Sequence, residues 1–214
     1  MSRSTTGEGI SVGSWTPIEK EFNYTDGIQK AVWTGSDVII LGMSDDPGAR
    51  FNPTTGSYVS LGLMSVPFLK GGCSAIWTGS TIILWGGTDG TSLYNTGSIY
   101  NPSTNTWTPT STVYAPSPRR GHFAVWTGTE MIVWGGWDGI NYLNTGGRYN
   151  PSANTWLPVS TINAPTGREI MDCNSLSCSD NIAMQGIWTG SEMIVWGGWD
   201  GVQKVTTGGR YNPT

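Results

Sequence analysis

The sequence is poor in charged side chains. Lys, Arg, Asp and Glu make up 12% of its 214 residues, with 11 basic and 15 acidic side chains and a net charge of −4. Nucleic acids and anionic membrane surfaces attract proteins through clusters of Lys and Arg. No basic stripe occurs here, so we expect neither nucleic acid nor a membrane as a partner. No apolar run approaches the ~18 residues of a transmembrane helix, and residues 1–13 lack the apolar stretch of a signal peptide.

Histidine is almost absent. His122 is the only one, so a Ser-His-Asp or Cys-His catalytic set would have to use it, and no Gly-x-Ser-x-Gly turn accompanies it. Repeats of the sequence align His122 with Gln29, Cys73 and Met184 around a common axis. Such residues could bind a soft metal such as copper, but we favour the simpler interpretation that they line an axial channel. We therefore predict no metal, no other cofactor and no catalytic residue.

Cysteine is also scarce, with three residues in the chain. Cys173 and Cys178 lie in one insert, and we favour a local disulfide over two free thiols because a bond would restrain a segment that is costly to order. Such a disulfide would favour an extracellular or periplasmic location, which is otherwise unknown. Two cysteines without a second pair make a poor zinc site.

Glycine and tryptophan, by contrast, are abundant and recur at regular positions. The chain has 31 glycines and 12 tryptophans. Trp-Thr-Gly occurs at Trp33, Trp77, Trp126 and Trp188, and Trp-Gly-Gly follows the last three of these. Each copy also has an aromatic residue before Asn-Pro. Repeats of 40–50 residues with Gly and aromatic punctuation are typical of propellers and solenoids.

Each copy contains short apolar runs rich in β-branched residues, such as 82–85 and 131–134. Thr-Gly precedes each run and Gly follows it, which predicts a strand buried on both faces and not an amphipathic helix. We expect four strands per copy, lettered a to d. In the third copy strands a to d correspond to residues 121–126, 130–136, 146–151 and 154–158.

The Gly-Gly doublet after strand b, the Tyr before Asn-Pro in strand c and the Trp in strand d make the chain resemble the kelch repeat over about residues 28–214. The resemblance implies an all-β, kelch-type β-propeller in which each copy is a four-stranded antiparallel blade. The first copy has Leu41-Gly42-Met43 for Trp-Gly-Gly and Tyr58 for Trp, but keeps the register. Within a single domain of residues 1–214, blades are expected at about 28–61, 71–110, 120–160 and 182–214.

The fourth copy reaches Asn212-Pro213 without a strand d, whereas its signature Ser-Trp-Thr-Pro occurs at residues 14–17. We therefore expect strand 13–18 to close the last blade and cover its edge. Propellers have about 4–8 blades. Four blades could close alone, two chains could exchange strands into an eight-bladed homodimer, or the chain could be a fragment of a longer propeller.

Length differences between the copies fall in two kinds of loop. Trp33 and Trp77 are 44 residues apart against 49 for Trp77 and Trp126, and the missing residues lie between strands b and c. Trp126 and Trp188 are 62 apart, and the extra residues lie between strand d and the next strand a. These b–c and d–a loops emerge on the same side of a propeller, so we expect one variable binding face.

Aromatic side chains beside Asn, Asp and Arg on this face suit stacking on a sugar or contact with a protein side chain. We therefore predict a non-enzymatic binding or scaffold module that recognises a protein or a glycan, as the kelch resemblance implies. The expected ligand-binding residues are Tyr94, Arg119, Arg120, Trp137, Asp138, Asn141, Tyr142, Arg168, Trp199, Asp200, Gln203 and Lys204.

Two other functions remain open. The chain could be a carbohydrate-active or metal-dependent enzyme that uses an axial pocket, or a structural propeller that assembles by strand exchange. The repeated Asp-Gly pairs could suggest calcium, but too few oxygen ligands surround them, and a turn is favoured. Arg148 and Arg210, in strand c, are expected to tether strands to neighbouring loops.

Overall fold

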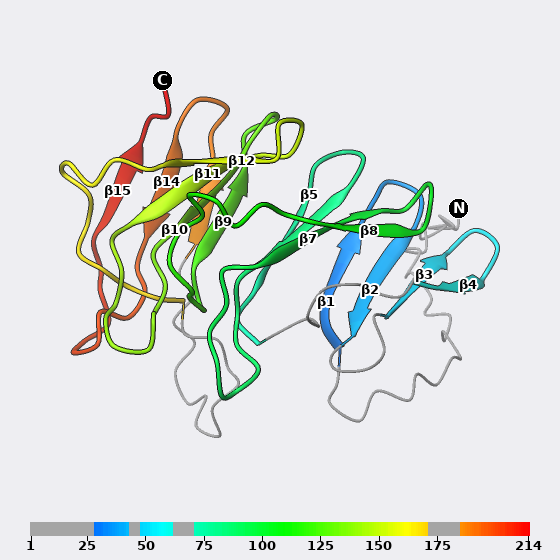
Figure 1. Ribbon diagram of the computed structural model, residues 1–214, viewed down its shortest axis with the longest axis horizontal. Helices are drawn as coiled ribbons and strands as arrows, with labels where there is room; N and C mark the ends of the chain where they lie inside the picture. Colours follow the sequence, from blue (N-terminus) through cyan, green and yellow to red (C-terminus); the bar gives the residue numbers. More distant parts are fainter. Residues whose placement is uncertain (1–27, 43–47, 62–70, 171–184) are drawn as a thin grey trace, which may run out of the picture.

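The computed structural model of the protein describes residues 28–42, 48–61, 71–170 and 185–214. These residues form fifteen β-strands and no α-helix, grouped into four antiparallel sheets. Among them, no helix has the length and apolar character needed to cross a bilayer. The sheets follow one another in sequence order from β1–β4 at one end to β13–β15 at the other (Figure 1). The predicted all-β architecture of repeated antiparallel sheets is confirmed.

The first and second sheets each contain four strands in the order of the chain. Because each strand pairs with the next, short turns are sufficient to connect them. The first repeat therefore forms a complete sheet despite its altered b-strand ending. The strands are β1 (Ile28–Trp33), β2 (Val38–Gly42), β3 (Gly48–Asn52), β4 (Ser57–Ser60), β5 (Ser74–Trp77), β6 (Ile82–Trp85), β7 (Gly97–Asn101) and β8 (Thr106–Pro109).

The third sheet has the same four-stranded order, and the fourth has the three described strands β13-β14-β15. Residues 13–18, which we predict as the missing strand of the fourth sheet, lie outside the described residues, so that closure stays a prediction. The strands are β9 (Phe123–Trp126), β10 (Met131–Trp134), β11 (Gly146–Asn150), β12 (Thr155–Pro158), β13 (Gln185–Trp188), β14 (Met193–Trp196) and β15 (Gly208–Tyr211).

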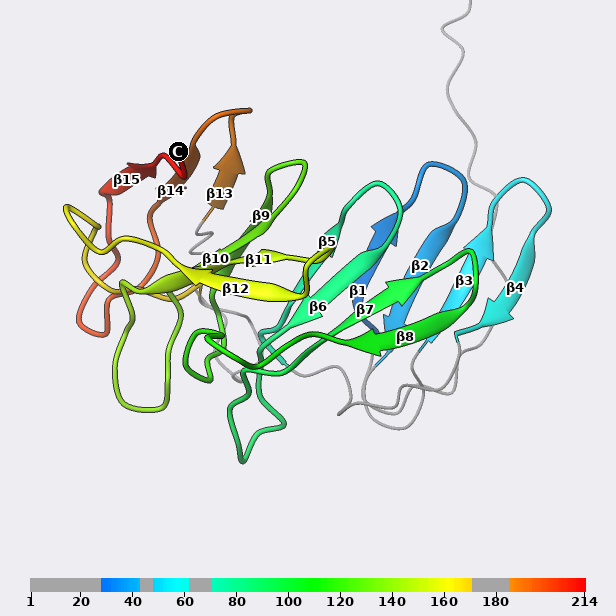
Figure 2. The same cartoon turned by 45° about the horizontal axis from the view of Figure 1, so that its top comes forward.

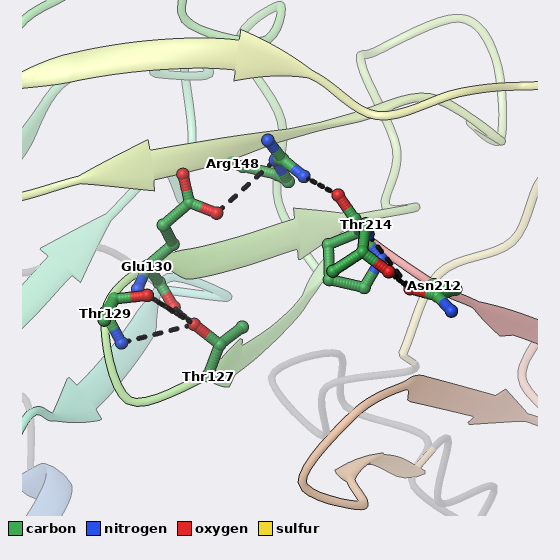
Figure 3. Close-up of polar contacts among 7 residues, drawn as sticks. Thr127, Thr129, Glu130, Arg148, Asn212 and Thr214 are labelled. Atoms are coloured by element: carbon green, nitrogen blue, oxygen red, sulfur yellow. Dashed lines mark hydrogen bonds and ion pairs between the residues drawn. The ribbon is translucent and has the colours of Figure 1, made fainter.

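The repeated Trp-Thr-Gly motif builds the turn between the first two strands of each sheet. In the third sheet, the Thr127 hydroxyl donates to the Glu130 carbonyl oxygen at 3.1 Å and accepts from the Glu130 N–H at 2.9 Å. Gly128 has a φ of 103°, a backbone conformation that residues with a Cβ rarely adopt. Figure 3 shows this turn at Thr127 and Glu130. Thr and Gly are thus required by the turn itself.

The core lies between successive sheets. Ile82 and Leu84 of β6 belong to the apolar cluster shared with the first sheet. Ile83 and Trp85, which alternate with them, belong to the cluster shared with the third sheet. A strand buried on both faces explains why the run 82–85 has no polar residue. The same alternation in β10 links the third sheet to the second and fourth.

The four sheets form an open arc and not a closed ring. The innermost strands contact one another in the series β1, β5, β9 and β13. Within the described part of the chain, β1 and β13 form no comparable contact. Figure 2 shows the fourth and first sheets at opposite ends of the molecule, with the second and third between them. In this arrangement, the four sheets of one chain do not close alone.

Arginine side chains of the third strands tether one sheet to the next. Arg148 of β11 forms an ion pair with Glu130 at 3.4 Å and donates a hydrogen bond to the carbonyl of Pro213, beyond β15 (Figure 3). Arg50 of β3 donates to the Pro102 carbonyl of the second sheet at 2.7 Å. The predicted tethering role is therefore confirmed for Arg148.

Trp156 and Leu157 provide a direct test of this packing, because they are neighbours on opposite faces of β12. Trp156 is 2% exposed and packs on Trp85 and Tyr149, whereas Leu157 is 51% exposed. We expect Trp156→Ala to lower the free energy of unfolding by about 3–5 kcal/mol because it leaves a cavity between two sheets. We expect Leu157→Ala to cost less than about 1 kcal/mol. Urea unfolding of both variants measures the difference, and equal losses would contradict it.

Candidate binding face

The b–c and d–a loops, on one side of the arc, are ordered by a pairing of three segments that repeats from sheet to sheet. In the third sheet, Arg120 and Trp137 exchange two backbone hydrogen bonds of 3.1 and 2.9 Å. In the fourth sheet, Glu169 and Trp199 do the same at 3.0 and 3.1 Å. Each Trp also bridges to the far side of its own b–c loop. The end of each d–a loop is therefore held beside the b–c loop of the sheet that follows it.

Asp-Gly pairs shape the tips of the b–c loops. One carboxylate oxygen of Asp138 accepts from the N–H groups of Ile140 at 2.9 Å and Asn141 at 2.7 Å. Asp200 accepts in the same way from residues 202 and 203. These backbone donors lower the pKa of both carboxyl groups from their usual value. The interpretation of Asp-Gly as a turn signal is confirmed.

Arg120 is an exposed cation that contacts both an aromatic ring and a carboxylate. Its guanidinium carbon lies 4.7 Å from the centre of the Trp137 ring, and its Nε lies 3.9 Å from a carboxylate oxygen of Glu169. The Arg120 side chain is 44% exposed, but that of Glu169 only 11%. A cation held between an aromatic face and a carboxylate keeps a defined position while its outer side stays accessible.

Arg119 and Arg168 differ from their expected placement. Both were predicted on the exposed loop surface, but Arg119 is 1% exposed and Arg168 is 0% exposed. Arg119 donates to the carbonyls of Gly135 and Thr145 at 3.0 and 2.8 Å. The prediction of exposure is therefore wrong for this pair, because the rigid guanidinium fork fits two carbonyl groups that the folded b–c loop places close together.

Both buried arginines connect neighbouring sheets. The backbone of Arg119 pairs with Gly87 and Tyr94 of the second sheet, while its side chain binds the third. Arg168 repeats this connection between the third and fourth sheets, donating to Gly197 at 3.2 Å and Thr207 at 2.7 Å. Burial lowers the pKa of Arg119 to about 10 and lowers that of Arg168. Arg119 therefore remains charged at neutral pH.

The remaining predicted residues lie around the b–c loops. Tyr94 donates a hydrogen bond to the Asp89 carboxylate, which raises the pKa of the phenol. The ring of Tyr142 lies against the backbone of Gly201, where an added Cβ would approach it to 2.4 Å. Tyr142 thus packs on the next b–c loop. Half-buried residues are Tyr94, Trp137, Asp138, Tyr142, Trp199 and Asp200, and exposed residues are Arg120, Asn141, Gln203 and Lys204.

Glu169 was not predicted as a site residue. It occupies in the fourth repeat the position that Arg120 has in the third, since both follow the buried arginine and pair with the Trp of the b–c loop. Opposite charges at equivalent positions of two repeats are the signal that could have identified it. We name the surface of Arg120, Trp137, Glu169 and Trp199, with the exposed residues of the adjoining b–c loops, the binding face.

A cavity of about 390 Å³ lies beside the binding face and is bordered by the innermost strands. Cys73 and His122 both line it, as does Lys30. Gly121 and Ile170, which directly follow Arg120 and Glu169, also line it, so the binding face adjoins this cavity. The side chain of Gln29 and the whole of Met184 lie outside the described residues. The structure therefore brings together two of the four residues expected around the axis.

His122 is buried beside Trp85, with the two ring centres 5.1 Å apart. Neither ring nitrogen has a hydrogen-bond partner among the described residues. Burial, reinforced by the charges of Arg119 and Lys30, lowers the pKa of His122 to about 3. The part of the chain that the structure describes holds no group of three or more His, Cys, Asp or Glu arranged to bind a metal ion.

The predicted disulfide residues Cys173 and Cys178 lie outside the described residues, so that bond stays a prediction.

Comparison with protein families places residues 31–190 in a match to the model described as KLHDC2/KLHL20/DRC7 Kelch-repeats domain. The match covers 160 of the 214 residues. A comparison with curated proteins found no match.

Arg119 and Arg120 are neighbours with opposite exposure, which makes them a matched pair for mutation. We expect Arg119→Ala to reduce the free energy of unfolding by about 2–4 kcal/mol, because it removes charged hydrogen bonds and deprives the buried Gly135 carbonyl of its donor. Arg120→Ala should cost less than about 1 kcal/mol, as expected for an exposed ion pair. Urea unfolding measures both values. A larger loss in Arg120→Ala would contradict the buried-tether role of Arg119.

The buried His122 predicts a stability that depends on pH. Its folded-state pKa of about 3 lies below the ordinary value of 6.5, so protons bind the unfolded chain preferentially between these values. Stability is therefore fully present above about pH 6.5 and falls as the pH decreases towards 3. We expect the wild-type protein to lose about 2 kcal/mol more than His122→Gln between pH 7 and pH 5. Parallel pH profiles in the two proteins would exclude a buried neutral imidazole.

Proposed function

Because the chain belongs to the kelch-repeat family, we propose that it is a non-enzymatic interaction module that holds a protein partner on its binding face. Kelch-repeat domains generally act as protein-interaction scaffolds, which supports the general part of this proposal. The particular partner surface is inferred from the loop residues. The observation that carries it is the cluster of Arg120, Trp137 and Glu169, which presents an exposed cation on a fixed backbone.

The chemistry of the cluster favours an acidic or carbonyl-rich protein segment. Arg and Trp are among the residues that contribute most to protein–protein binding energy. Glu169 holds one edge of the Arg120 guanidinium at 3.9 Å, and the part of Arg120 that remains exposed can still donate to a carboxylate or peptide oxygen. Because the backbone pairing with Trp137 orders Arg120 in advance, little conformational entropy is lost on binding.

The same geometry favours a protein over a glycan. A sugar ring binds an aromatic residue by stacking on its face, but the guanidinium of Arg120 covers one face of Trp137 at 4.7 Å. Tyr142, the other aromatic residue of this b–c loop, packs against Gly201. Each ring is therefore partly occupied by another group of the protein, which leaves less aromatic surface for sugar stacking. A protein partner can instead contact the guanidinium and the neighbouring polar side chains.

The side chains of the cavity between the innermost strands favour binding over catalysis. Among the described residues that line it there is no Asp or Glu, the side chains that glycoside hydrolysis commonly uses in pairs. His122 is neutral at physiological pH because its pKa is lowered to about 3, so it is a poor proton donor there. These features support an interaction module ahead of a carbohydrate-active enzyme.

The proposal is tested by selecting peptides that bind the wild-type protein from a random-sequence display library, with a glycan array probed in parallel. We expect selected peptides enriched in Asp or Glu, and at least tenfold weaker binding to Arg120→Ala and Trp137→Ala, the loss typical of interface hot spots. Ser152→Ala, exposed in the turn at the opposite end of the same sheet, is the matched control and should bind normally.

The outcomes separate the alternatives. Peptide binding that is unaffected by either substitution would place the interaction elsewhere on the molecule. Binding on the glycan array alone would replace the protein partner with a carbohydrate. Turnover of a sugar substrate without peptide binding would favour the enzyme.

A further inference from the structure

The outer face of the fourth sheet exposes apolar side chains that its equivalents bury. Trp196 ends β14 and is 61% exposed, whereas Trp85 and Trp134 at the same position of β6 and β10 are 1% and 2% exposed. Ile187 of β13, which pairs with Ile194, is 56% exposed on the same face. In the second and third sheets, these positions pack against the following sheet. The fourth sheet therefore presents a face suited to one more sheet.

The first sheet has the complementary face. In every interface between sheets, the first and third residues of one b strand pack towards the preceding sheet, as Met193 and Val195 do. Val38 and Ile40 hold these positions in β2 and are half-buried, although their equivalents in the other three sheets are fully buried. The two ends of the arc thus carry the two halves of an interface that occurs three times within it.

The fourth sheet also carries the backbone N–H and carbonyl groups that form hydrogen bonds between neighbouring sheets elsewhere in the arc. The N–H of Gly136 donates to the carbonyl of Arg168 at 2.7 Å, and the carbonyl of Leu143 accepts from the N–H of Arg168 at 3.1 Å. Gly198 and Val205 are the equivalents of Gly136 and Leu143. Among the described residues, no backbone group pairs with the Gly198 N–H or the Val205 carbonyl in this way. A donor and an acceptor are therefore available beside the apolar face.

Arg210 is the equivalent of the arginine side chains that bind a neighbouring sheet. Arg50 and Arg148 reach the carbonyl of the proline that follows the third strand of a neighbouring sheet. Arg210, at the same position of β15, is 73% exposed and contacts only Glu192 of its own sheet at 3.5 Å in the described part of the chain. The equivalent proline of the first sheet is Pro53.

We propose that a second copy of this chain covers the exposed face: the first sheet of each protomer packs against the fourth sheet of the other, and two copies close into one ring of eight sheets. The β1 and β13 strands of one chain do not come together, so its own two end faces cannot pack on each other in this arrangement (Figure 2). A twofold axis satisfies both end faces at once. Eight sheets lie within the usual range of about 4–8 blades.

In this ring, Arg210 donates to the Pro53 carbonyl of the partner subunit. Trp196 packs over the partner's Val38 and Ile40. The contact is head-to-tail, so each protomer contributes two different surfaces. The two binding faces lie on one side of the ring, which would let a partner with two binding segments attach to both.

The mass in solution tests the proposal. Sedimentation equilibrium should show the 23.0 kDa chain associating to twice that mass, with a dissociation constant between about 1 nM and about 10 µM, as for ordinary specific interfaces. We expect Trp196→Glu to weaken the dimer by about 30-fold or more, since it places a charge at the centre of an apolar contact. Val38→Glu should do the same from the complementary face, and Arg210→Ala should weaken it less.

Ile140→Glu is the matched control, because Ile140 is 85% exposed but lies on a b–c loop away from both end faces. It should leave the dimer unchanged, and thermal unfolding should show all variants folded. A monomer at every concentration would overturn the proposal, and hydroxyl-radical footprinting that then found Trp196 protected would indicate that residues of the same chain cover it. Mass that grows without limit would also overturn the closed ring, in favour of an open filament.

Discussion

Each sheet of this protein is stabilised by apolar packing against the neighbouring sheets. The central strands β6 and β10 bury alternate side chains on opposite faces, so the core is a series of layers between sheets. A single antiparallel sheet of four short strands has no second layer of its own and would leave both apolar faces in water. This dependence on neighbours fixes the spacing of the sheets, and it leaves the outer faces of the first and last sheets as the places where the series is incomplete.

Contacts between neighbouring sheets also hold the loops in place. Arg119 and Arg168 pair through their backbones with one sheet and through their guanidinium groups with the next, so the d–a loops cannot move independently of the sheets. Their burial places the following residues, Arg120 and Glu169, beside Trp137 and Trp199, with Arg120 exposed and the Glu169 carboxylate largely covered. An exposed cation on a fixed backbone, backed by a buried carboxylate, is the physical basis of the proposed protein-binding function.

Sequence reasoning identified the loops of the site better than the individual side chains. Trp137, Asp138 and Arg120 lie in the predicted loops, and the Asp-Gly turns form as their sequence indicates. Arg119 and Arg120 are residues of the same type and are adjacent in sequence, yet one is buried and the other exposed. Residue type cannot distinguish them, because the distinction depends on carbonyl groups of Gly135 and Thr145 that only the folded loop brings within reach.

The sequence alone determined the repeat, the order of the described strands within each sheet and the residues of the turns, because these depend on local periodicity and on the conformational preferences of Gly, Asn and Thr. It could not decide how many sheets close the ring, since that depends on the wedge angle between layers and on which apolar faces meet. The tertiary structure decided that Trp85 and Trp134 are buried and Trp196 exposed, although all three stand at the same position of the repeat. Their difference arises solely from the presence or absence of a following sheet, which is a long-range contact that no local pattern encodes.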